Sequence, residues 1–75
     1  MKNVRKPLEI LKETALVLCA QSQLARNAME LATSPTYLGV APAAVEKIIR
    51  ARLAVHNVSQ EAADSFVRAY YEAKG

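Results

Sequence analysis

The stretch PLEILKETALVLCAQSQLARNAMELA, residues 7–32, decides the fold of this chain. Its apolar residues recur at alternating steps of three and four, and a second row repeats every seven residues. This spacing is typical of an amphipathic helix. Pro7 suits a first helical position, because the N–H that proline lacks would have no partner there. No glycine and no further proline follows before residue 33, so the sequence predicts one helix over residues 7–32.

Such a helix is longer than the rest of the chain can cover. At 1.5 Å per residue it measures about 39 Å, whereas two later helices would reach only about 24 and 21 Å. The stretch either breaks near Gln21-Ser22-Gln23 and folds as a hairpin, or stays whole and pairs with a second copy. Because sharp kinks usually coincide with glycine or proline, a continuous helix and a homodimer are favoured. The expected dimer interface is apolar and consists of Leu11, Val17, Leu18, Leu24 and Leu31.

The second half of the chain predicts a helical hairpin. Asn57 favours the left-handed conformation that ends a helix, and Ser59 is a suitable N-cap for the next one. The inward residues expected on the helix before this turn are Val45, Ile48, Ile49, Leu53 and Val55. The sequence thus predicts a single all-α domain over residues 1–75, a three-helix dimeric bundle with helices at about 7–32, 42–56 and 60–73 and a loop at 33–41.

A DNA-binding helix-turn-helix is the competing interpretation of that hairpin. The pair Val58-Ser59 fits the turn of the motif, but Leu53 stands where the motif needs a small residue. The outward side chains of the last helix include Glu61 and Asp64, and carboxylates repel phosphates. A capped hairpin explains the same residues and is preferred.

The charge of the chain keeps a DNA-binding regulator open as the alternative function. Ten Lys or Arg against seven Asp or Glu give a net charge of +3, which is compatible with nucleic acid without being diagnostic. The contacts would come from the basic N-terminal arm and the helix over 42–56, namely Arg5, Lys6, Lys47, Arg50 and Arg52.

Catalysis and cofactors find no support in the residue types present. Cys19 and His56 are the only cysteine and histidine, which is too few for a disulfide, a zinc site or a nucleophile with its base. No apolar run approaches the roughly 18 residues of a membrane span. We therefore expect no enzyme, no cofactor, no metal and no membrane partner. Cysteine usage favours a cytoplasmic location, and the small size is typical of a bacterial or phage accessory protein.

The expected function is that of a small intracellular, non-catalytic protein-interaction or regulatory module that self-associates. Tyr37 and Tyr71 are the predicted patch for a protein partner. Neighbouring residues of a helix point about 100° apart, so Tyr71 faces outward if Tyr70 faces the core. Leu16, in the middle of the polar face of the first helix, is a further candidate contact.

Overall fold

The computed structural model describes residues 5–16 and 21–75. Within these ranges the chain has four helices and no strand. The all-α class expected from the sequence is therefore confirmed. Pro7 and Pro42 each occupy the first position of a helix, as their geometry favours. The helices are α1 (Pro7–Leu16), α2 (Gln21–Ala32), α3 (Pro42–Val55) and α4 (Gln60–Lys74).

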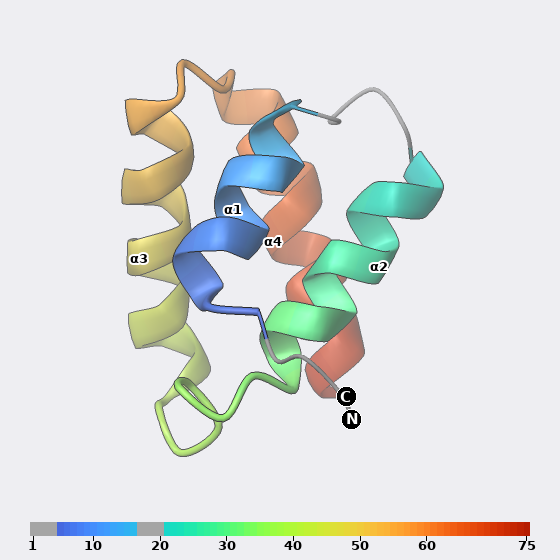
Figure 1. Cartoon of the computed structure of the whole chain (residues 1–75), viewed down its shortest axis with the longest axis vertical. Coiled ribbons are helices and arrows are strands. Elements are labelled where there is room, and N and C mark those ends of the chain that lie inside the picture. The colour runs from blue at the N-terminus through green and yellow to red at the C-terminus, as the bar shows by residue number, and fades with distance from the viewer. Residues whose placement is uncertain (1–4, 17–20) are drawn as a thin grey trace.

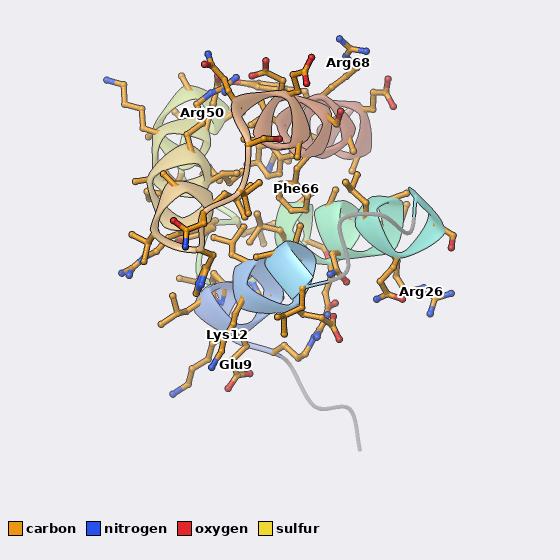
Figure 2. The ribbon with its side chains drawn as sticks, turned by 90° about the horizontal axis from the view of Figure 1, so that it is seen from above. Glu9, Lys12, Arg26, Arg50, Phe66 and Arg68 are labelled. Atoms are coloured by element: carbon orange, nitrogen blue, oxygen red, sulfur yellow. The ribbon has the colours of Figure 1, made fainter. Side chains whose placement is uncertain are left out.

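The four helices form a ring in which each one packs against two others. α1 packs against α2 and α3, and α4 packs against the same two helices from the other side (Figure 2). α1 and α3 run in one direction, and α2 and α4 run in the opposite direction (Figure 1). α1 and α4 therefore lie across the core from each other, and the fully buried Phe66 of α4 points into the space between the four helices (Figure 2).

The single helix expected over residues 7–32 is wrong, because α1 ends at Leu16 and α2 begins at Gln21 and packs against α1. Residues thirteen apart would be separated by about 20 Å on a straight helix. Instead, Asn27 Nδ2 donates a hydrogen bond to Thr14 Oγ1 at 3.0 Å. The apolar faces of α1 and α2 are covered by α3 and α4 of the same chain. The burial of apolar surface between the helices thus stabilises the divided form, although no glycine or proline interrupts the helical pattern.

All four helices contribute to one core. Its side chains are 6% exposed or less and share one contact network. They interdigitate as the amphipathic faces of the helices require. They are Ile10 and Leu11 of α1, Ala28, Leu31 and Ala32 of α2, Val45, Ile49 and Leu53 of α3, and Ala63, Phe66, Val67 and Tyr70 of α4.

The turn between α3 and α4 carries the capping groups that the sequence predicts. Asn57 has φ 63°, the left-handed conformation, and its N–H donates to the Ala54 carbonyl at 3.0 Å. The N–H of Val58 donates to the Leu53 carbonyl at 3.0 Å, which completes a Schellman motif. Ser59 Oγ then accepts from the Ala62 N–H at 3.2 Å and caps α4. The capped hairpin is confirmed, and α4 presents its apolar stripe to the core.

The connection between α2 and α3 packs partly onto the helices. Tyr37 and Val40 are half-buried against the core, whereas Leu38 projects into solvent. Ser34 is buried, and its Oγ accepts from the Thr36 N–H at 3.3 Å. Hydrogen bonds within the connection thus replace those of a helix and fix its path.

Candidate functional site

A polar cluster joins the N-terminal segment to α1 and α2. Arg5 Nη1 donates to Glu13 Oε1 at 2.6 Å, and Arg5 Nε donates to Glu30 Oε2 at 2.8 Å. Arg5 Nη2 donates to the other oxygen of Glu30 and, at 3.3 Å, to Asn27 Oδ1. Hydrogen bonds from Arg5 hold the pKa of Glu30 below its usual range, and those carboxylates raise the pKa of Arg5. Because two carboxylates of its own chain hold Arg5, its proposed contact with phosphate is not supported.

A second polar cluster lies on the surface where α3 meets α4. Arg50 donates to Glu46 at 3.0 Å and to Asp64 at 2.6 Å, and the hydroxyl of Tyr71 donates to Glu46 at 2.9 Å. The hydrogen bond from Arg50, followed by that from Tyr71, lowers the pKa of Glu46. Arg50 therefore has its charge opposed on both sides, and it too is a poor phosphate ligand.

The remaining predicted nucleic-acid contacts are exposed but do not form one basic surface. Lys6 precedes α1, while Lys47 and Arg52 lie on different sides of α3. Arg5 and Arg50 are paired with carboxylates, so the other three cations of the expected basic surface stand apart from one another. A duplex needs a continuous positive stripe to follow its phosphates.

Two residues of the predicted dimer interface lie inside the molecule. Leu11 and Leu31 belong to the core, so they are not available to a second copy in this fold. Leu24 is half-buried at the edge of that core, and Val17 and Leu18 lie outside the described residues. The physical reason is the packing of α2 against α1, which leaves Leu11 and Leu31 in the core with α3 and α4 of their own chain.

The predicted tyrosine patch has two differently placed members. Tyr37 packs half-buried against the core from the connection between α2 and α3. Tyr71 is exposed on α4, and its hydroxyl donates a hydrogen bond to Glu46. Its ring stands edge-on to that of Tyr70, with the two ring centroids 5.7 Å apart. No hydrogen bond or ring contact joins Tyr37 to Tyr71 in the described part of the chain.

One face of the ring was not foreseen as a site, and we call it the α1–α3 face. Glu13 and Thr14 lie on the flank of α1 that faces α2, as their polar contacts show. Leu8 and Ala15 lie on the other flank, which is beside α3. Likewise Glu46 and Arg50 lie on the flank of α3 that faces α4, as their hydrogen bonds with Tyr71 and Asp64 show. The opposite flank of α3, beside α1, carries Ile48, Arg52 and Val55.

This face combines exposed apolar side chains with positive charge. Leu8 is 49% exposed and Val55 is 70% exposed, which corrects the inward position expected for Val55. Leu16, 78% exposed, stands at the end of α1, on the same end of the molecule as Val55 (Figure 1). Lys12 and Arg52 are exposed beside them. Leu16 was the residue that gave a sequence signal for this surface, because it interrupts a polar face.

The opposite side of the ring holds a groove between α2 and α4 with a volume of about 360 Å³. Small side chains make the groove, since Ala25, Ala62, Ser65 and Ala69 leave space between the two helices. Leu24 also lines it, and Arg68 and Glu72 bring charges of both signs to it.

Three further findings bear on the site. In the described ranges, no three His, Cys, Asp or Glu side chains gather closely enough to hold a metal ion. No helix in the same ranges combines the length and apolarity that crossing a membrane requires. Comparison of the chain with protein-family models, curated proteins and solved structures finds no match.

Proposed function

We propose that this protein is a small, non-catalytic interaction module that binds a protein partner through its α1–α3 face. The observation that carries the proposal is the exposure of Leu8, Leu16 and Val55 on adjacent parallel helices. Apolar side chains gathered on one face of a small domain mark a contact surface more often than isolated ones do. Burying them against a partner would be favourable at about 25 cal/mol per Å² of apolar area.

The charges of the face select the kind of partner. Lys12 and Arg52 contribute two cations, and the exposed Glu9 lies on the outer side of α1 near Lys12 (Figure 2). Glu13, the acid next to Lys12 in the sequence, is paired with Arg5. Complementary charge around an apolar contact speeds association and rejects partners of the wrong sign. A partner that presents an apolar stripe flanked by Asp or Glu, such as an acidic amphipathic helix, fits this surface.

Nucleic acid fits the same face less well. A duplex offers phosphates but little apolar surface, so Leu8, Leu16 and Val55 would gain little from the contact. Arg5 and Arg50, two of the cations on which DNA binding would depend, are already paired with carboxylates. A protein partner therefore uses more of what the face exposes.

Site-specific photocrosslinking in the cells that make the protein tests this proposal. A photoreactive amino acid at position 8 or 55 should give adducts with a partner protein of defined mass. The same residue at position 29 is the matched control, because Met29 is 59% exposed on α2, away from α3. Equal adducts at all three positions would contradict the assigned face.

Charge reversal tests the expected partner chemistry. Lys12→Glu with Arg52→Glu should reduce the adduct yield several-fold, whereas Lys47→Glu, on the outer side of α3, should leave it nearly unchanged. Binding of labelled duplex DNA that weakens steeply with salt and depends on Lys12 would favour the regulator instead.

A further inference from the structure

We infer that the chain forms a symmetrical homodimer through the α2–α4 groove, with the two α4 helices antiparallel. This inference does not rest on the proposed function, because the groove lies on the side of the ring opposite to the α1–α3 face. It also replaces the interface first expected from Leu11 and Leu31, which the core occupies.

The shape of the groove admits a helix. Ala62, Ser65 and Ala69 recur at steps of three and four along α4, so they form one stripe of small side chains beside Ala25 of α2. A ridge of side chains from another helix packs most closely where the facing residues are small. Leu24, half-buried in the same groove, supplies an apolar surface for that ridge.

The charges on α4 identify the occupant as a second copy. Glu61 and Arg68 are about two turns apart, so both lie on the outer side of the helix next to Ser65. A twofold axis midway between them would place each Arg68 opposite Glu61 of the second copy. One symmetrical contact thus creates two ion pairs, as an isologous interface requires.

Other arrangements do not satisfy the same charges. Parallel α4 helices would place Arg68 against Arg68 and Glu61 against Glu61, and like charges in contact oppose association. The α1–α3 face carries Lys12 and Arg52 against one nearby acid, Glu9, so its excess of positive charge opposes contact with its own copy. Of these two faces, the α2–α4 groove suits self-association better, because Glu61 and Arg68 beside it balance each other.

Reciprocal charge exchange tests the interface. Sedimentation from about 5 to 500 µM, a range that spans weak dimers, gives the dissociation constant of the wild type. Arg68→Glu and Glu61→Arg should each raise that constant at least about tenfold, because each places two like-charge pairs across the axis. The double variant restores opposite charges and should return within about threefold of the wild type.

A matched control and independent readouts complete the experiment. Arg26 projects from α2 away from α4 (Figure 2), so Arg26→Glu makes the same charge change outside the groove and should leave the constant unchanged. A wild type that stays monomeric at the highest concentration, or a dimer indifferent to both single exchanges, overturns the inference. Circular dichroism confirms that each variant is folded. Crosslinking at positions 8 and 55 should be unaffected by Arg68→Glu, so failure of the dimer and failure of the proposed function are distinguishable.

Discussion

Removing one buried hydroxyl, by Thr14→Val, tests whether α1 and α2 pack as a pair. Thr14 and Asn27 are fully buried, and Asn27 Nδ2 donates to Thr14 Oγ1 at 3.0 Å. Thr14 Oγ1 also donates to the Ile10 carbonyl at 2.9 Å. Valine has nearly the shape of threonine, so the substitution leaves no cavity. It takes away the acceptor and leaves an amide donor of Asn27 buried without this partner.

The expected loss follows from that unpaired donor. A buried polar group without a hydrogen bond costs about 1–3 kcal/mol. The added methyl group returns about 0.8 kcal/mol of apolar burial, so a net loss of about 0.2–2.2 kcal/mol is expected. A domain of this size has a total stability of roughly 4–11 kcal/mol. The substitution should therefore lower the melting temperature by about 1–18 °C.

Urea unfolding followed by circular dichroism measures this loss. The midpoint should fall while the dependence on urea stays constant, because the surface exposed on unfolding does not change. Thr33→Val is the matched control, since Thr33 is exposed, and it should change stability by less than about 0.5 kcal/mol. Combined with Thr14→Val, Asn27→Leu should cost less than the sum of the two single changes. A Thr14→Val protein as stable as wild type would refute the packing of α1 on α2, because on a continuous helix the two residues never meet.

Three further perturbations probe the caps, the core and the ion pairs. Tyr70→Phe should leave stability unchanged or raise it by up to about 1 kcal/mol in the same urea titration. The reason is that the buried Tyr70 hydroxyl has no hydrogen-bond partner among the described residues. A loss of stability above about 1 kcal/mol would contradict this expectation. Ser59→Ala should cost about 1 kcal/mol and Asn57→Gly should cost nothing or stabilise, measured by thermal unfolding; equal losses in both would argue against the capped turn. Since Arg5 lowers the pKa of Glu30, the pair contributes stability above the pKa of an unfolded glutamate, about 4.3, and loses it as pH falls through the lower folded value. Unfolding free energies at about pH 7 and about pH 3 should therefore differ more in the wild type than in Arg5→Gln, and equal differences would contradict the pairing.

Local chemistry made the second half of the fold predictable. Pro42, Asn57 and Ser59 each favour one backbone conformation at a helix end, and the structure has all three in those roles. Such signals act over a few residues, so they can be identified without knowing what packs against them. The outward position of Glu61 and Asp64 also followed from helical periodicity alone.

The first half could not be predicted in the same way. Between Pro7 and Ala32 no residue demands a break, and whether the helix divides depends on which surface covers its apolar face. The available signal was Asn27, a polar residue four positions before Leu31 and thus on the same buried side. Paired with Thr14 it marks a contact between two helices, but a single sequence does not say which partner it meets. The α1–α3 face escaped prediction for the same reason, because exposure of Leu8 and Val55 is decided by where α1 lies on α3.

The ring arrangement has a consequence for the order in which the molecule opens. α1 is the shortest helix and does not pack against α4 in the described structure, so its detachment leaves α2, α4 and α3 side by side as a smaller unit. Amide hydrogens of α1 are then expected to exchange through local opening, before those of α4. A partner that bridges α1 and α3 would close this route. Slower exchange in α1 on binding would report occupation of the α1–α3 face even where no other spectroscopic signal changes.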